Sequence, residues 1–291
     1  MIEQFQTYLK VARVHVLFMP IFLIFNALSY TRYKYHVSHT ISFIFVGISI
    51  LLYNLATNSL SEYRDYKNGV DDTYSSGTKY RLASGIISDN NMLLFARLMF
   101  LLGSITGILA LVCGSKYLFI PGIMGAGMVI AYSEKPFELK YKALSELCVF
   151  FVYGILIFTS CIMALTDTIR IDDIVYSIPF GLLTANVVLA NNIRDFEFEK
   201  GKTLTIPIKY GLKFSYGLLF FITHIAFLCV PIFVYCDIVP KIWFITLITY
   251  PIIFISIVKI NSPKFINVFG VLQVSFTIIG TIAFFLAEFL E

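Results

Sequence analysis

Residues 41–72 read ISFIFVGISILLYNLATNSLSEYRDYKNGVDD, and this stretch decides the fold. Its first part, 41–60, carries no charge and is long enough, at about 20 residues, to cross a hydrocarbon core as a helix. Its last part, 61–72, holds Glu62, Asp65, Asp71 and Asp72. The stretch therefore predicts a membrane helix with acidic side chains concentrated at one end.

The whole chain has the composition of a membrane protein. Its 291 residues are 58% hydrophobic and only 14% charged, whereas about 25% of the residues in a soluble domain are charged. The apolar runs are continuous instead of alternating, which favours helices over a barrel. We expect an all-α polytopic membrane protein with a single domain, 1–291, and nine transmembrane helices. The predicted helices lie near 12–30, 40–60, 92–114, 117–132, 143–165, 174–192, 215–235, 240–258 and 267–289.

The distribution of basic residues predicts the orientation in the membrane. Most of the 22 Lys and Arg fall in loops on one side if the N-terminus is cytoplasmic, as the positive-inside rule requires. We therefore expect a multi-pass protein of the plasma membrane that keeps its first helix, with the N-terminus and the acidic helix ends at the cytoplasmic face and the C-terminus outside. The net charge of +4 is explained by this topology, so no nucleic acid is expected as a partner. No obligate protein partner is inferred.

Polar side chains recur at helical spacing before the first acidic cluster. Asn54, Asn58 and Glu62 stand four residues apart and Asp65 follows three residues later. Positions three and four apart share a face of a helix. The spacing predicts one polar face at the end of the second helix.

A second acidic segment has the same pattern. The sixth predicted helix ends in LANNIRDFEFEKGKTL, 189–204, where Asn191, Asp195 and Glu199 again stand four apart. The two segments are four helices apart and fall on the same side of the membrane. This arrangement indicates an internal repeat that brings the two acidic helix ends face to face.

Clustered carboxylates repel one another unless a cation lies between them. Carboxylate and amide oxygens are hard ligands of the kind that Mg²⁺ prefers, and no His or Cys lies near either cluster, which argues against zinc. Basic residues are interleaved with the acids, and together they suit a diphosphate bridged by Mg²⁺. Ordinary solvated loops are the alternative interpretation, but the repeated four-residue spacing argues against it.

These segments resemble the UbiA superfamily of intramembrane prenyltransferases, which have nine helices and two Asp-rich motifs. The similar segments are 54–71, NLATNSLSEYRDYKNGVD, 81–88, RLASGIIS, and 191–199, NNIRDFEFE. Residues 130–154, IAYSEKPFELKYKALSELCVFFVYG, are most similar to the quinone branch that includes 1,4-dihydroxy-2-naphthoate polyprenyltransferase. Glu62 and Glu199 stand where the family commonly has Asp.

The resemblance implies Mg²⁺-dependent transfer of a prenyl group from an allylic prenyl diphosphate to an aromatic acceptor, with 1,4-dihydroxy-2-naphthoate in menaquinone biosynthesis as one candidate. It implies that Asp65 and Asp195 are catalytic. The implied metal ligands are Asn58, Glu62, Asp65, Asp71, Asn191, Asp195 and Glu199, and the implied diphosphate-binding residues are Arg81, Lys202, Arg194 and Lys67.

Other functions stay open from the sequence. A UbiA-type enzyme of specialised metabolism would use another acceptor, and a terpene cyclase would capture the allylic cation internally. An ion-coupled transporter belongs to a different class, but transporters place polar residues at broken helices near the midplane, whereas both clusters here lie at helix ends. Outside the motifs, Lys140 and Lys142 are interpreted as topogenic charges, with pairing to the carboxylate of an aromatic acid acceptor as the alternative. Glu146 is interpreted as a first-turn charge that complements the helix dipole.

Overall fold

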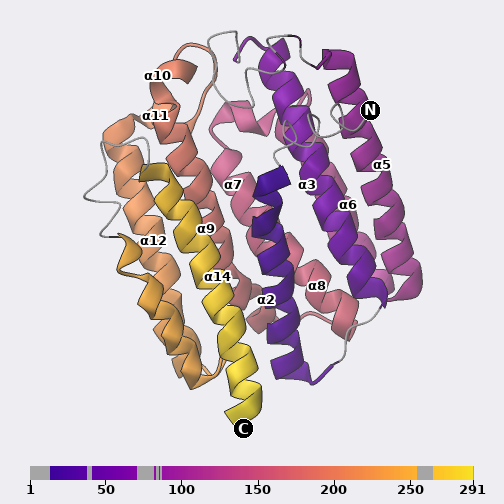
Figure 1. The fold of residues 1–291 in the computed structure, drawn as a ribbon, viewed down its shortest axis with the longest axis vertical. Coiled ribbons are helices and arrows are strands. Elements are labelled where there is room, and N and C mark those ends of the chain that lie inside the picture. Colours follow the sequence, from indigo (N-terminus) through magenta and orange to yellow (C-terminus); the bar gives the residue numbers. More distant parts are fainter. Residues whose placement is uncertain are drawn as a thin grey trace.

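The computed structural model describes residues 14–37, 41–70, 82, 85, 87–253 and 265–290, and within these ranges the chain forms helices and no strand. Long helices run side by side along the long axis of the molecule and form one bundle (Figure 1). They are α2 (Phe18–Tyr35), α3 (Ile41–Lys67), α5 (Asp89–Cys113), α6 (Phe119–Ser133), α9 (Ile171–Arg194), α12 (Leu212–Tyr235) and α14 (Phe265–Leu290).

One further long helical segment is continuous but irregular. It consists of α7 (Ser145–Val149), the π-helical segment η4 (Phe150–Leu156) and α8 (Ile157–Thr166). Such π segments are rare and often occur at functional sites. Short elements connect the long ones: η1 (Val14–Leu17), η2 (Lys116–Leu118), η3 (Leu139–Lys142), α10 (Phe196–Glu199), α11 (Ile206–Tyr210) and η5 (Lys241–Thr249).

Seven helices of the described chain are long and apolar enough to cross a membrane. They lie at Ile41–Lys67, Asp89–Cys113, Lys116–Ser133, Ser145–Thr166, Ile171–Arg194, Leu212–Tyr235 and Asn267–Leu290. The remaining two predicted helices, 12–30 and 240–258, correspond to α2 and to the 3₁₀ segment η5, which do not meet the same criteria. The polytopic all-helical architecture is therefore confirmed, while a total of nine spans stays a prediction.

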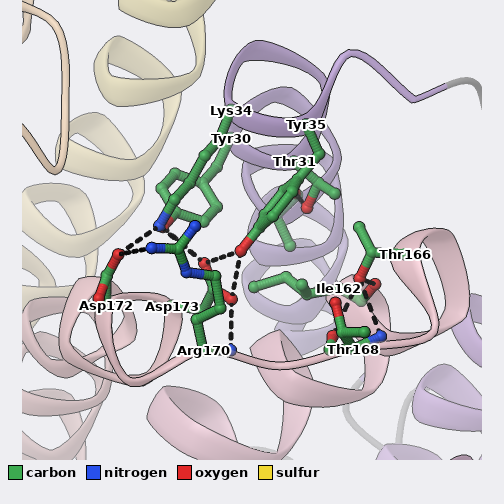
Figure 2. A network of polar contacts seen from close by, with 11 residues as sticks. Tyr30, Thr31, Lys34, Tyr35, Ile162, Thr166, Thr168, Arg170, Asp172 and Asp173 are labelled. Carbon is green, nitrogen blue, oxygen red and sulfur yellow. Dashed lines mark hydrogen bonds and ion pairs between the residues drawn. The ribbon is translucent and has the colours of Figure 1, made fainter.

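Helix α2 ends five residues later than its predicted end at residue 30, because its polar last turns have partners on α9. Figure 2 shows side chains of α2 and of the start of α9 pointing toward one another. The fully buried carboxylate of Asp173 accepts hydrogen bonds from Tyr30 Oη at 2.8 Å and from Tyr35 Oη at 2.8 and 3.0 Å. Lys34 Nζ donates to the same carboxylate at 3.1 Å. Hydropathy along the chain cannot reveal such cross-helix partners.

Two glycines set the distance between α9 and η4. A Cβ built on Gly181 would lie 2.7 Å from the carbonyl oxygen of Phe150 and 2.8 Å from Gly154 Cα. A Cβ on Gly154 would lie 2.9 Å from Gly181 Cα. Only residues without a side chain allow two backbones to approach so closely. This contact fixes α9, and the acidic segment at its end, against the helix formed by α7, η4 and α8.

Candidate functional site

A cavity of about 340 Å³ opens inside the bundle, lined by residues from η1 to α10. At one end its lining includes Asn58, Asp65, Asn191, Asp195 and Glu199, which are five of the predicted metal ligands. Further along, the lining becomes apolar and includes Val46, Leu118 and Ile157. The cavity therefore combines a charged end with an apolar interior.

The cavity follows α3 for much of the thickness of a membrane. Asp65 lines it near the end of this helix and Val46 lines it near the beginning. Nineteen residues of α-helix at about 1.5 Å each span roughly 28 Å, close to the ~30 Å of a hydrocarbon core. This shape suits an amphiphile with an anionic head group and a long apolar chain.

Three connecting segments meet at the charged end. Lys202 Nζ, after α10, donates to the carbonyl oxygen of Val70, after α3, at 3.2 Å. The backbone N–H of Ala143, after η3, donates to the carbonyl oxygen of Leu204 at 2.7 Å. Asp65 and Glu199, one from each acidic segment, also line a second, small cavity of about 20 Å³. The structure thus brings the two segments together at one end of the bundle.

The carboxylate of Asp65 is almost completely buried, with 2% of the residue exposed. Lys140 Nζ donates to its Oδ2 at 2.5 Å, and Tyr141 Oη donates to its Oδ1 at 2.7 Å. Lys140 Nζ also donates to Ser61 Oγ at 2.6 Å. Because burying a charge without a partner is strongly unfavourable, these donors from η3 explain how Asp65 is accommodated.

Asp195 lies at the junction of α9 and α10 and is bound by its neighbour in the chain. Arg194 Nε donates to Asp195 Oδ1 at 2.6 Å and a terminal guanidinium nitrogen donates to Oδ2 at 2.8 Å. The backbone N–H of Glu199 donates to the carbonyl oxygen of Asp195 at 2.9 Å. The second segment therefore also presents its first carboxylate beside a basic side chain.

The polar face predicted on α3 is only partly the face that lines the cavity. Asn54, Asn58 and Asp65 line it, and Asn58 Nδ2 donates to Asn54 Oδ1 at 3.1 Å. Glu62 is 2% exposed but does not line the cavity. At about 100° per residue, position 62 lies about 80° around the helix from position 54, which places Glu62 at the margin of this face.

The predicted diphosphate-binding residues are distributed differently. Arg194 lines the main cavity. Lys202 contacts the Val70 carbonyl and lies over the Phe198 ring, 4.0 Å from its centroid. Lys67 forms an ion pair with Asp89 of α5 and, like Lys202, is not among the lining residues. Arg81 and the metal-ligand candidate Asp71 lie outside the described residues.

Comparison with known proteins fits this architecture. The profile described as the UbiA prenyltransferase family matches residues 17–265. The chain belongs to this family. It is similar to the 1,4-dihydroxy-2-naphthoate octaprenyltransferase of Bacillus subtilis (strain 168), with 28% identity over 178 residues that cover 61% of this chain and 57% of that protein. The match therefore spans less than two thirds of this curated relative.

Solved UbiA structures share the fold at low sequence identity. A UbiA homologue from Aeropyrum pernix K1 superposes with a TM-score of 0.71 at 14% identity, covering 94% of this chain and 98% of that one. A UbiA homologue from Archaeoglobus fulgidus bound to DMAPP and Mg²⁺ superposes with a TM-score of 0.66 at 16% identity, covering 96% and 99%. The bundle described above is thus a UbiA fold.

The donor set at the charged end suits a hard cation. Carboxylate and amide oxygens of Asp65, Asn58, Asp195, Asn191 and Glu199 line one cavity, and Mg²⁺ completes its shell with water and substrate oxygens. In the part of the chain that is described, no three His, Cys, Asp or Glu side chains already form a ready metal cage. Lys140 and Arg194 instead contact the carboxylates. The oxygen donors at this end of the cavity therefore fit Mg²⁺.

Sequence patterns did not identify several side-chain contacts at or near this candidate site. Asn192 Nδ2 donates to Glu146 Oε1 at 2.8 Å, and Ser145 Oγ donates to Glu146 Oε2 at 2.9 Å. Tyr153, on the π segment η4, hydrogen-bonds with Asn54 of α3. The contacts of Asn192 with Glu146 and of Tyr153 with Asn54 join residues far apart in the chain, so local spacing does not predict them. Glu146 lies in the first turn of α7, as expected, but it is also buried, with 5% of the residue exposed, and the interpretation as a dipole-complementing charge did not include its contact with Asn192.

Proposed function

We propose that this protein is a Mg²⁺-dependent prenyltransferase that moves a prenyl group from an allylic prenyl diphosphate to an aromatic acceptor within the membrane. The observation that carries the proposal is the cavity with two acidic segments at one end and an apolar interior behind them. The family membership supports the reaction class. The archaeal homologue solved with DMAPP and Mg²⁺ supports the same substrate chemistry.

The metal-binding role is assigned to the oxygens of both segments: Asn58, Glu62, Asp65 and Asp71 on the first, and Asn191, Asp195 and Glu199 on the second. When bound, Mg²⁺ neutralises the charge that develops on the departing diphosphate. Arg194, Lys202, Lys67 and Arg81 are the proposed basic contacts, and Arg194 has the strongest support because it lines the cavity. The side chains of Asp65 and Asp195 would orient the head group, so that the allylic carbon faces the apolar interior.

The interior protects the reactive carbon after ionisation. An allylic cation must be kept from water until the acceptor attacks. Tyr53, Tyr132 and Tyr153 line the cavity, and aromatic faces attract a cation by roughly 0.5–2 kcal/mol each. These three tyrosines are the best placed for this role, because Tyr63 packs with Leu82, Ile87 and Met92 instead.

The proposed acceptor is an aromatic acid of the 1,4-dihydroxy-2-naphthoate type, which would place the protein in menaquinone synthesis. The similarity to the Bacillus octaprenyltransferase supports this choice. We further propose a single domain of nine spans in the plasma membrane, with the N-terminus and the charged end of the cavity at the cytoplasmic face, because basic residues concentrate on that side.

The test uses purified protein in lipid nanodiscs with Mg²⁺ and labelled prenyl diphosphates of several chain lengths. One arm contains 1,4-dihydroxy-2-naphthoate, a second contains other phenolic acids, and a third contains no acceptor. Prenylated naphthoate in the first arm supports the proposal. Product in the second arm alone would reassign the acceptor, and a cyclic hydrocarbon in the third would indicate a cyclase. Accumulation of substrate in proteoliposomes without turnover would indicate a transporter.

A further inference from the structure

A polar pair lies in the main cavity between its charged end and its apolar interior. Tyr153, on the π-helical segment η4, and Asn54, on α3, both line the cavity, and Asn54 Nδ2 donates a hydrogen bond to Tyr153 Oη. Hydrogen-bonding groups are unfavourable beside a hydrocarbon chain, which offers them no partner. The pair is therefore better suited to a polar substrate group than to the prenyl chain.

The hydrogen bonds of this pair leave the proton of the Tyr153 hydroxyl available. Asn58 Nδ2 donates to Asn54 Oδ1 at 3.1 Å, so the Asn54 amide presents its nitrogen to the tyrosine, and Tyr153 Oη is the acceptor in that contact. A phenol can donate one hydrogen bond as well as accept. Within the described chain, no group accepts a hydrogen bond from Tyr153 Oη. The tyrosine thus offers a donor to a molecule in the cavity.

Other hydroxyl groups on the cavity wall are engaged by the backbone. Ser49 Oγ donates to the carbonyl oxygen of Gly103 at 2.8 Å. Thr57 Oγ1 and Thr184 Oγ1 each donate to a carbonyl oxygen of their own helix at 2.8 Å. Such contacts satisfy a hydroxyl without any ligand. Tyr153 differs from these residues because its partner in the chain is itself the donor.

The depth of the pair matches the expected place of the reacting carbon. Along α3, Asn54 is about 6 Å deeper than Asn58 and about 16 Å from Asp65, at about 1.5 Å per residue. A diphosphate held by the acidic segments would direct its first allylic carbon toward this level of the cavity. The ring that attacks this carbon must lie beside it, so substituents of the ring come within reach of Tyr153.

We propose that Tyr153, oriented by Asn54, donates a hydrogen bond to a hydroxyl oxygen of the aromatic acceptor and thereby selects hydroxylated rings. A site built to hydrogen-bond a substrate hydroxyl discriminates strongly against an analogue that lacks it. The inference rests on the proposed function and deepens it, because it assigns an acceptor-binding residue outside the two acidic motifs. The assigned group is the hydroxyl and not the aromatic face of Tyr153.

Two variants of the pair separate the hydroxyl from the ring. Tyr153→Phe removes the hydroxyl and keeps the aromatic face. Asn54→Asp keeps the size of the side chain, but an ionised carboxylate only accepts, so it takes the proton of the Tyr153 hydroxyl and can still accept from Asn58. Tyr176→Phe is the matched control. Tyr176 Oη donates to Asn26 Oδ1 at 2.6 Å in another buried pair of tyrosine and asparagine, which does not line the cavity.

The experiment measures inhibition of prenyl transfer to 1,4-dihydroxy-2-naphthoate in lipid nanodiscs by 1-hydroxy-2-naphthoate and by 4-hydroxy-2-naphthoate. Each analogue lacks one of the two hydroxyls, so only one of them retains the hydroxyl that Tyr153 binds. In Tyr153→Phe and Asn54→Asp, we expect this analogue to bind about tenfold more weakly than in wild type, as for the loss of one hydrogen bond. The other analogue should keep its inhibition constant, and Tyr176→Phe should retain both wild-type constants.

The outcomes separate this inference from the proposed function. Equal weakening of both analogues in the variants of the pair, or no change in either, would overturn the role of the hydroxyl while prenyl transfer stands. A changed KM for the prenyl diphosphate with unchanged inhibition constants would place the pair beside the donor chain and would also overturn it. If another phenolic acid is the acceptor, the same comparison uses its analogue without the hydroxyl. If folded wild type prenylates no aromatic acid, the proposed function fails, and the inference fails with it.

Discussion

The carboxylate of Glu146 at the start of α7 accepts a hydrogen bond from the side-chain amide of Asn192 near the end of α9, at 2.8 Å. Asn192 lines the main cavity beside Asn191 and Asp195, whereas Glu146 does not. Glu146 therefore acts as a positioning residue, since it orients the end of α9 without facing the cavity. We expect Glu146→Leu to weaken Mg²⁺ binding, so that the metal concentration for half-maximal activity rises about tenfold. The reason is that a lost buried hydrogen bond to a charged group is worth roughly 1.5–3 kcal/mol.

Glu146→Gln is the conservative variant for this prediction. Its amide oxygen can still accept from Asn192, so it should recover most of the wild-type metal dependence. The measurement is initial rate against Mg²⁺ concentration at saturating prenyl diphosphate. A loss of kcat with unchanged metal dependence in Glu146→Leu would instead assign Glu146 a role in the chemical step or in general stability.

The acids of the two segments should be equally indispensable. Asp65→Asn and Asp195→Asn keep the size of each side chain but remove the charge that holds the metal, so we expect each to lower kcat/KM by at least about 10². Product formation with labelled prenyl diphosphate measures this loss. Asp167→Asn is the control, because Asp167 is an exposed residue at the end of α8 and does not line the cavity. Nearly full activity in either cluster variant would remove that segment from the site.

The contact between Gly154 and Gly181 predicts a defect of packing rather than of chemistry. A methyl group at position 181 would lie 2.7 Å from the Phe150 carbonyl oxygen, so Gly181→Ala must separate α9 from η4. Overpacking typically costs about 1–3 kcal/mol, and we expect a lower midpoint of thermal unfolding in detergent. Gly217→Ala on α12 is the matched control, because a Cβ there meets no atom within 4 Å. Equal midpoints for the two variants would contradict this account of the contact.

The buried network at the opposite end of α9 should support stability and not metal binding. Asp173 lies 22 residues before Asp195, about 33 Å along a helix, and its side chain is fully buried beside Lys34. Removing one partner of a buried ion pair costs about 3–5 kcal/mol, so Asp173→Ala should lower the unfolding midpoint strongly. Mn²⁺ affinity of the protein that remains folded should be unchanged.

Asp172→Ala tests whether this effect depends on burial. Asp172 also pairs with Lys34 Nζ, at 3.1 Å, but its side chain is 40% exposed. Exposed ion pairs contribute little, so we expect a small shift of the unfolding midpoint. Similar large shifts in both variants would show that net charge at this end of the bundle matters more than the buried contacts of Asp173.

The sequence predicted what depends on local pattern. Continuous apolar runs identified the helical bundle, and the four-residue spacing at Asn54–Asn58 and at Asn191–Asp195 identified segments that both line one cavity. It did not predict what depends on contact between distant elements. The pairing of Lys140 with Asp65, of Glu146 with Asn192 and of Tyr35 with Asp173 all join residues more than forty positions apart.

The residue spacing also did not predict the direction in which individual side chains point. Lys67 and Glu62 lie in the first acidic segment, yet neither lines the cavity. Helical rotation turns Lys67 away from the face of Asn58 and Asp65 and places Glu62 at the margin of that face. Lys140 was interpreted as a topogenic loop charge, with the acceptor carboxylate as an alternative partner. Its contacts with Ser61 and Asp65 depend on η3 lying against the end of α3. Charge and spacing alone therefore predicted two segments that line one cavity but did not predict which of their side chains face it.

The most direct test of the central claim is the location of Mn²⁺ by anomalous scattering in crystals of the protein with an unreactive prenyl thiolodiphosphate. The account predicts metal peaks coordinated by Asp65 on one side and by Asp195 or Glu199 on the other, with the thiolodiphosphate between them and its chain in the apolar part of the cavity. Peaks confined to one acidic segment, or a thiolodiphosphate bound elsewhere, would contradict a single site formed by both.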